Sequence, residues 1–307
     1  KSLATCKTFT LPQLDLTDIA EKPDPYPLQG EYLQNEIYLQ KAELFTRDLL
    51  YFHCAFDLET LPAHLYDVLP FFCNFILHIG SEKSTYAQLA ERTAQNACKI
   101  QAKLDICHSL AQAGKFRKIL SFSLQSLEKT AESSLALLYE HINEKLFFER
   151  DKLKELIRAY WASLSSDLQN NTNSYANIQA MKTLSEPSYL RDRWAGISHL
   201  KQAKIWRNSL DENIEEKMQL LNELAQWLKN QVPISAAFAS SSKSEKVLYD
   251  FLQLFPVNSN KIVTATNPDF EIISGQKEFL MLTNEVSSFA RAINAPYFYD
   301  DSSIALE

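Results

Sequence analysis

The chain has 307 residues, 46% of them apolar and 22% charged, which is the balance of a globular protein with one large core or two smaller ones. Its formal net charge of −7 disfavours a nucleic-acid-binding protein, because such a protein needs a basic face to displace the counterions of phosphates. Only five glycines are present, and they form neither a phosphate-binding loop nor a dinucleotide-binding fingerprint.

No apolar run approaches the roughly 20 residues that a membrane-spanning helix needs, so we expect no membrane partner. The longest run, residues 68–79, is interrupted by Pro70, Asn74 and His78. The five cysteines are odd in number and contain no Cys-x-x-Cys pair, which predicts reduced thiols in the cytoplasm or an organelle matrix. Because the chain does not begin with methionine, we expect it to be an internal piece of a longer protein.

Proline is concentrated near the N-terminus, with a series at Pro23, Pro25 and Pro27. Each proline fixes φ and removes an amide donor, so this composition favours an extended segment. We therefore expect residues 1–40 to form an extended linker arm in front of a folded domain.

The following segments alternate between strand and helix patterns. Residues 49–57 alternate apolar and polar side chains, which predicts a strand whose buried face carries Leu50, Phe52, Cys54 and Phe56. Helical segments are predicted over residues 64–78 and 86–96.

A hairpin is predicted next. Residues 100–106 and 120–124 both alternate with a period of two, and the turn between them contains Gly114. We expect these segments to pair as antiparallel neighbours and to bury Ala102, Leu104, Phe122 and Leu124.

From residue 127 to residue 231 the apolar period becomes helical. Three stripes recur at spacings of three or four residues. They consist of Leu127, Ala131, Leu135, Leu138 and Ile142; of Leu153, Leu156, Ile157, Tyr160 and Leu164; and of Ile214, Met218, Leu221, Ala225 and Leu228. The third stripe follows Ser209-x-x-Glu212, which has the pattern of a capping box.

The end of the chain returns to strand patterns. A strand is predicted over residues 234–238, a short helix over residues 245–254, and further strands over residues 262–264 and 278–286. The whole order predicts one α+β fold with a largely antiparallel sheet and helices packed on it.

The histidines offer no clear metal site. His141, Glu144 and Lys145 come within one residue of the His-x-x-Glu-His motif of some zinc peptidases, but the lysine ammonium would repel the ion. We therefore expect His141 to be a half-exposed surface residue.

Two further groups have a structural and a functional interpretation. Tyr51, His53 and Asp57 share one strand face, which is either the wall of a chamber or a face turned to solvent. The basic and aromatic segment 191–207 is expected to place its tryptophans in the core and its charges in water, rather than to bind nucleic acid.

Five motifs follow one another between residues 10 and 290. They are Leu11-Pro12-x-Leu14-x-Leu16-x-Asp18-Ile19; Phe56 and Leu58 with Leu61-Pro62; Pro70-Phe71-Phe72-Cys73 with Gly80, Tyr86 and Leu89; Trp194-x-Gly196-Ile197-Ser198-x-Leu200; and Asn284-Glu285-Val286-Ser287. In this order they resemble the C-terminal half of presequence proteases, a branch of the pitrilysin/insulinase zinc metallopeptidases.

This resemblance implies a LuxS/pitrilysin-type metallopeptidase fold within a four-domain enzyme. Residues 41–260 would be its third domain, and residues 261–307 the first strands of a truncated fourth domain. In such enzymes two halves close on a chamber that engulfs unfolded peptides, and the first domain holds the zinc.

The resemblance also implies that this piece is not catalytic. Laid on the zinc helix of the first domain, Phe71, Asn74 and Phe75 take the places of the two histidines and the glutamate. Phenyl rings cannot bind zinc, and a neutral amide is no general base. We expect no catalytic residue and no cofactor in this chain, with zinc in the catalytic half of the parent protein.

The expected function is a non-catalytic part of the peptide-enclosing chamber. Its partners would be the catalytic N-terminal half of the same protein and unfolded peptide substrates. Two alternatives stay open: a protein–protein interaction module that uses the helices of residues 127–231, and an inactive recognition subunit that pairs with a separate catalytic chain.

Overall fold

A computed structural model describes residues 27–96, 98–109, 112, 114–241, 244–256, 278–280 and 287–293. Its main sheet has six strands in the order β1-β2-β8-β3-β6-β5. Only β2 and β8 are parallel, and the other neighbours are antiparallel. The strands are β1 (Leu28–Tyr32), β2 (Tyr38–Glu43), β3 (Leu49–Asp57), β5 (Lys99–His108), β6 (Phe116–Leu127) and β8 (Ser235–Ser240), and the short β4 (Gly80–Ser81) and β7 (Leu146–Phe147) pair separately.

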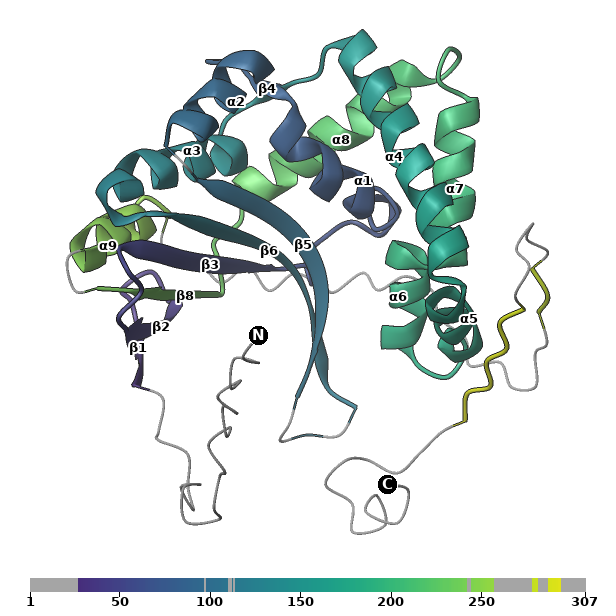
Figure 1. The fold of residues 1–307 in the computed structure, drawn as a ribbon, viewed down its shortest axis with the longest axis horizontal. Helices are drawn as coiled ribbons and strands as arrows, with labels where there is room; N and C mark the ends of the chain where they lie inside the picture. The colour runs from purple at the N-terminus through teal and green to yellow at the C-terminus, as the bar shows by residue number, and fades with distance from the viewer. Residues whose placement is uncertain are drawn as a thin grey trace, which may run out of the picture.

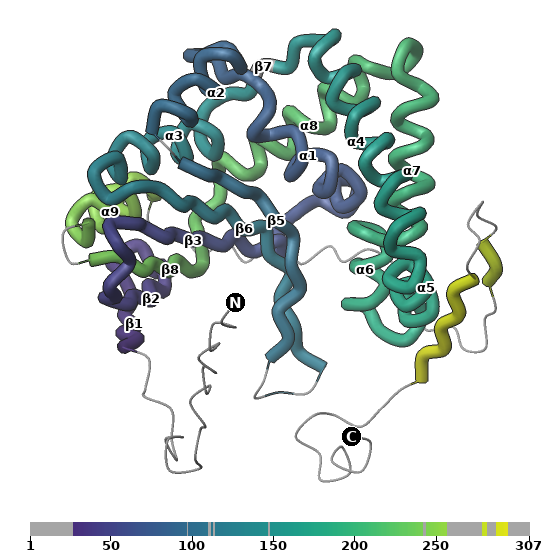
Figure 2. The backbone as a smooth tube through the Cα atoms, in the orientation of Figure 1, coloured from purple at the N-terminus to yellow at the C-terminus, as the bar shows by residue number. Residues whose placement is uncertain are grey.

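The helices lie on one side of this sheet. Figure 1 shows α1, α2, α3 and α8 above the sheet and α4 to α7 as a second group at the right, and Figure 2 shows the same path of the backbone. No helix of the described residues lies against the lower face. The helices are α1 (Leu69–Phe75), α2 (Tyr86–Gln95), α3 (Ala131–Asn143), α4 (Arg150–Asn170), α5 (Thr172–Met181), α6 (Glu186–Ala195), α7 (Ile197–Asn208), α8 (Ile214–Lys229) and α9 (Glu245–Gln253). The α+β prediction is confirmed.

The core lies between the sheet and the helices. Phe56 of β3 and Phe122 of β6 are both fully buried, with their ring centroids 6.0 Å apart. Phe52 meets Phe251 of α9 edge-on at 5.3 Å. Each such ring stabilises the fold by roughly 1.5–3 kcal/mol through the apolar area that it removes from water. Because buried and exposed side chains alternate along β3, one face of the sheet packs in the core.

The predicted hairpin is confirmed as β5 and β6. Ala102 lies opposite Phe122, and Leu104 lies opposite Leu120. Phe122 and Leu124 are buried as expected, but Ala102 and Leu104 are only partly buried. The reason is their place on β5, which is an edge strand paired only with β6.

The helical region differs from the prediction in detail. Residues 127–231 form six helices rather than three, and Leu127 ends β6 instead of starting a helix. The predicted capping box at Ser209 is wrong, because α8 begins at Ile214. The Ser209 hydroxyl donates to the Ile205 carbonyl and accepts from the ammonium of Lys217, so it is not available as a cap.

The expected linker arm needs a correction. Residues 28–40 contain β1 and the start of β2. These two strands pair with each other, and β2 also pairs with β8, so this part belongs to the sheet and is not an extended arm. Residues 1–26 lie outside the described residues, as do residues 262–264 and 281–286, where strands were predicted. Residues 278–280 are described and have no regular secondary structure. None of the helices in the described ranges is both long and apolar enough to cross a bilayer.

Candidate functional site

The lower face of the sheet, which we call the open face, is formed by the side chains that alternate with the core positions. The strand register aligns them in rows that run across all six strands. One row consists of Leu28, Ala42, Ala239, Tyr51, Gln125 and Lys99, and the next of Gly30, Gln40, Ala237, His53, Ser123 and Gln101. A third row consists of Tyr32, Tyr38, Ser235, Ala55, Ser121 and Lys103.

A shallow pocket of about 500 Å³ lies on the open face. Its floor is made of small side chains, because Ala42, Ala237 and Ala239 meet where β2 and β8 pair. Larger side chains stand around this floor, among them Tyr51 and His53 of β3. The hollow therefore follows from the contrast between alanines at the centre and long side chains at the rim.

The β1 side of the open face carries an aromatic pair. The rings of Tyr32 and Tyr38 lie with their centroids 5.0 Å apart. The hydroxyl of Tyr38 lies directly over Gly30, where a Cβ atom would collide with it. Glycine at this position thus leaves room for the Tyr38 side chain beside β1.

The charged side chains of the open face near the pocket come from β5, whose Asp105 follows two lysines on the same face. Lys99 lines the pocket and Lys103 follows on the same face of β5. Partial burial lowers the pKa of His53, and the nearby charge of Lys103 lowers it further. The predicted group of Tyr51, His53 and Asp57 is thus divided, since the first two border the pocket and Asp57 lies beyond it.

The positions that resemble a degenerate zinc motif lie on the other side of the sheet, in α1. Phe71 stacks on Trp206 with ring centroids 3.8 Å apart and also meets Tyr160 edge-on. Phe75 is buried against the same tyrosine, with ring centroids 5.8 Å apart. Asn74 is exposed, and its amide donates to the Pro70 carbonyl at 2.8 Å. These side chains supply aromatic packing and a local hydrogen bond.

A buried histidine completes this aromatic cluster. His199 of α7 is 2% exposed, and its Nε2 lies 2.7 Å from the hydroxyl of Tyr160. Burial lowers the pKa of His199 to about 4, although the charge of Asp67 acts in the opposite direction. The ring is therefore neutral at physiological pH. Within the described residues, no group of three or more His, Cys, Asp or Glu side chains is placed to hold a metal ion.

The prediction of a half-exposed His141 is wrong. Its side chain lies at the buried side of α3, with 4% exposure, and burial lowers its pKa to about 4. A hydrogen bond with the Ile76 backbone holds the ring in place. The apolar stripe of α3 marks only the helix face that packs toward the sheet. The segment after α1, which contains Ile76, also covers α3, and this second contact buries His141.

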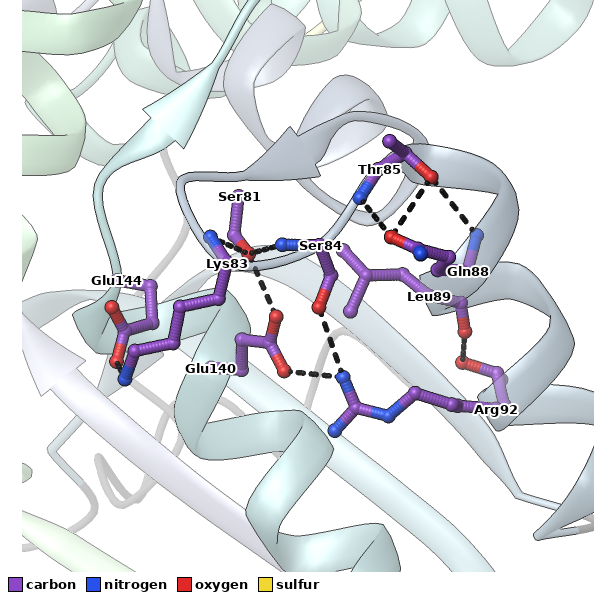
Figure 3. Close-up of polar contacts among 10 residues, drawn as sticks. Ser81, Lys83, Ser84, Thr85, Gln88, Leu89, Arg92, Glu140 and Glu144 are labelled. Atoms are coloured by element: carbon purple, nitrogen blue, oxygen red, sulfur yellow. Dashed lines mark hydrogen bonds and ion pairs between the residues drawn. The ribbon is translucent and has the colours of Figure 1, made fainter.

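Next to His141, the carboxylate of Glu140 joins three elements (Figure 3). It accepts from the Ser81 hydroxyl at 2.7 Å and from the Arg92 guanidinium at 2.8 Å. Burial raises the pKa of Glu140, but these hydrogen bonds outweigh it and leave the pKa below its usual value. Glu140 is thus an ionised brace between β4, α2 and α3. Thr85 and Gln88 form the reciprocal cap at the start of α2 in the same view.

The basic and aromatic segment in α6 and α7 has the expected division. Trp194 and Trp206 are buried, while Arg191, Lys204 and Arg207 are exposed. Of the described cysteines, Cys54 and Cys73 are buried, and Cys54, Cys73, Cys98 and Cys107 form no disulfide. The prediction missed the alanine floor of the open face, because it is assembled by the pairing of β2 with β8, which are distant in sequence.

Sequence comparison relates the chain to a family named for its association with a peptidase. Residues 5–205 match the family described as associated with peptidase M16, subfamily C. The chain is 23% identical over 254 residues to the mitochondrial presequence protease of Yarrowia lipolytica. This alignment covers 81% of this chain and 26% of that protein. It is also 23% identical over 268 residues to presequence protease 1, chloroplastic/mitochondrial, of Arabidopsis thaliana. This second alignment covers 83% of this chain and 24% of that protein. The chain thus spans about a quarter of the length of these relatives.

Among solved structures, the fold is similar to that of a conserved protein from Enterococcus faecalis V583. The TM-score is 0.55 at 12% sequence identity, and the similarity covers 78% of this chain and 55% of that chain. At this identity the likeness concerns the fold alone.

Proposed function

The chain belongs to the family associated with peptidase M16, subfamily C, and we propose that it is a non-catalytic region of a larger zinc endopeptidase. Its role is to form part of the wall of a chamber that encloses unfolded peptides. The curated relatives support this proposal, because they are presequence proteases about four times as long as the part that this chain matches. The catalytic half of the same protein would supply the zinc and the residues that act on the peptide bond.

The chemistry of α1 supports the non-catalytic role. By the family resemblance, Phe71 and Phe75 stand where the zinc helix of the first domain has histidines. Their rings pack against other aromatic side chains. Asn74 carries a neutral amide that is bonded to its own helix backbone. Phenyl groups offer no lone pair to a metal, and an amide does not take up a proton at neutral pH. The helix is retained here for packing.

The observation that carries the proposal is the open face. Within the described residues, helices cover one side of the sheet and none covers the other, and such a face offers a broad surface to a partner. Its floor of alanines and serines accepts side chains of different size, and the amides of Gln40, Gln101 and Gln125 can bond to a peptide backbone whatever its sequence. Such a surface suits a chamber that holds many extended peptides weakly.

The proposed partners follow from this role. The catalytic half would close over the open face and leave the peptide between the two parts, and a weak, partly polar interface is expected where opening admits substrate. The names of the relatives place those proteins in mitochondria or chloroplasts, which supports an organelle matrix as the location.

An assay in trans tests this role. The catalytic half is expressed separately and given an unfolded fluorogenic peptide, with either this chain or a longer chain that continues through the next domain. We expect the longer chain to bind the catalytic half and raise turnover above its background, and this chain to do so more weakly. A longer chain that neither binds nor raises turnover contradicts the chamber role and favours the interaction-module alternative.

A pair of variants makes the assay specific for the open face. Ala237→Trp places an indole on the pocket floor and should lower turnover in trans. Gln226→Trp adds the same group to the exposed face of α8, on the helical side, and should leave turnover unchanged. Equal loss from both variants would show that the pocket has no particular role.

A further inference from the structure

We propose that the pocket on the open face holds one aromatic side chain of an extended peptide, with the ring lying flat on the methyl groups of Ala42, Ala237 and Ala239. This rests on the proposed function in one respect, since it requires that peptides reach the open face. It goes further because it names the chemical class of side chain that the pocket prefers.

The floor of the pocket is a flat triangle of three methyl groups. Ala42 and Ala239 lie opposite each other on β2 and β8, and Ala237 lies on the same face of β8, two residues before Ala239. Neighbouring strands are about 4.8 Å apart and alternate residues of a strand are about 6.7 Å apart, which sets the size of this triangle. Because all three methyl groups point out of the same face of the sheet, the face of a phenyl or indole ring can contact them together.

Two rings of β3 stand beside this floor. Tyr51 lies opposite Ala239, and His53 lies opposite Ala237. Both rings line the pocket, and Tyr51 is 44% exposed, so it is free to contact an occupant. An aromatic ring on the floor would lie about one strand spacing, or about 5 Å, from these two rings, which is within the range of edge-to-face ring contacts. An aliphatic side chain would contact the floor in the same way but would not gain the contact between rings.

The opposite wall limits the size of the occupant. Leu28 of β1 lies three strand spacings from Tyr51, which places their backbones about 14 Å apart. Gln40 of β2 lies two spacings from His53, or about 10 Å. The side chains of both walls narrow these gaps further. The pocket volume of about 500 Å³ is that of a small-ligand site, which fits one large side chain of a peptide.

The floor of the pocket offers no partner to a charged group. Of the described residues that line the pocket, none is Asp or Glu. The ammonium of Lys41 bonds to Glu245 at 2.7 Å on the helical side of the sheet, and Lys99 lies at the far end of its row, on β5. Burial lowers the pKa of His53, which keeps its ring neutral at physiological pH. A charged occupant of the floor would therefore lose hydration without gaining an opposite charge, whereas a neutral ring loses little.

Methyl NMR of the full chain tests the proposal, with isotope-labelled alanine methyl groups and three uncharged, unfolded peptides. The peptides are identical except at one position, which is Phe, cyclohexylalanine or Ala. A nucleus that lies against the face of an aromatic ring is shifted upfield. We therefore expect the Phe peptide to shift the methyl signals of Ala42, Ala237 and Ala239 upfield and to leave that of Ala162, which is exposed on α4, unchanged.

The affinities from the same titrations measure the preference for an aromatic ring. Cyclohexylalanine is as apolar as Phe but has no aromatic ring, so we expect it to bind about threefold to tenfold more weakly than Phe, because it lacks the contacts between rings. The Ala peptide should bind most weakly of the three.

A pair of variants locates this preference. Tyr51→Leu removes a ring from the wall of the pocket and should reduce the difference between the Phe and cyclohexylalanine peptides. Tyr32→Leu is the control and should keep the full difference, because Tyr32 is an exposed tyrosine of the same face that does not line the pocket. Thermal melting checks that both variants fold, and if Tyr51→Leu unfolds, the alanine methyl shifts of the unmodified chain decide.

Three results overturn the proposal. They are alanine methyl signals that the Phe peptide leaves unchanged, equal affinity for the Phe and cyclohexylalanine peptides, and a difference between these two peptides that a folded Tyr51→Leu variant leaves intact. The titration uses this chain alone, whereas the assay in trans uses the catalytic half, so the two claims fail separately. Turnover in trans without the alanine shifts loses only this inference, and alanine shifts without turnover contradict only the chamber role.

Discussion

The two deeply buried histidines make the stability of this chain depend on pH. His141 and His199 are held neutral because burial lowers the pKa of each from 6.5 to about 4. In the unfolded chain both rings regain the ordinary value, so between pH 6.5 and pH 4 the unfolded state binds more protons than the folded state. The free energy of unfolding must then fall as the pH falls through this window, and it is unaffected by these groups above it.

The magnitude follows from the two pKa values. At pH 5 each histidine should lower the free energy of unfolding by about 2 kcal/mol relative to pH 8, and by about 3 kcal/mol once the pH is below 4. Two such groups together approach the whole stability of an ordinary domain, which is about 5–15 kcal/mol. His53 and His78 have lowered pKa values as well and act in the same direction.

The surroundings of the rings contain few groups that could reverse this effect. His199 faces the hydroxyl of Tyr160, and the charge of Asp67 favours its protonated form less strongly than burial disfavours it. For His141, Glu140 favours the protonated form, while His78 and Arg92 oppose it together with burial. In both sites burial is the largest effect, so the sign is the same.

Urea titration at pH 8, 6 and 5, followed by tryptophan fluorescence, measures this dependence. His199→Gln should be less stable at pH 8 but should lose about half of the fall in stability between pH 8 and pH 5. His64→Gln is the control, because His64 is exposed and paired with Glu223, and it should keep the full fall. A free energy of unfolding that is the same at pH 8 and pH 5, or a fall that His199→Gln leaves intact, would refute the reasoning.

Three further predictions concern metal and packing. The purified chain should hold no zinc, and stoichiometric zinc that survives mild chelation in elemental analysis would contradict this. Phe71→Ala should lower the free energy of unfolding by about 3–5 kcal/mol because it empties a stacked, fully buried site, whereas Asn74→Ala on the exposed side of the same helix should cost under about 1 kcal/mol. Glu140→Gln should lower the free energy of unfolding by about 1–3 kcal/mol, because it leaves Arg92 without its anionic partner. Glu144→Gln is the control and should change the free energy of unfolding by less than about 1 kcal/mol, because its partner Lys83 is exposed. Equal effects of the two variants would show that the Glu140 brace is unimportant.

The sequence predicted those elements whose signal is local. The alternation of residues 49–57 placed β3 with its bounds as observed, and the shared period of residues 100–106 and 120–124 predicted the pairing of β5 with β6. Both succeed because one face of each strand faces a core, which demands apolar side chains at every second position. The order of these elements predicted the α+β class, which is confirmed, and the family resemblance added the prediction that Phe71, Asn74 and Phe75 of α1 hold no zinc.

The missed features depend on contacts between distant segments. Residues 28–32 have no buried side chain, so β1 gave no apolar alternation and was hidden behind the proline series. His141 was misjudged because a second surface packs on α3, and a single helix stripe cannot show that. The pocket floor needs Ala42 of β2 beside Ala239 of β8, a parallel pairing over almost two hundred positions of chain.

The central claim, that the open face contacts the peptide during proteolysis, has a direct test in the full-length parent protein. A photoactivatable phenylalanine analogue is placed at Tyr51 on the rim of the pocket, or at Ile205, which is exposed on α7 on the helical side. The protein is irradiated while it turns over a labelled unfolded peptide. The account predicts a cross-link to the peptide from position 51 and none from position 205, whereas labelling from position 205 alone, or from neither position, would contradict it.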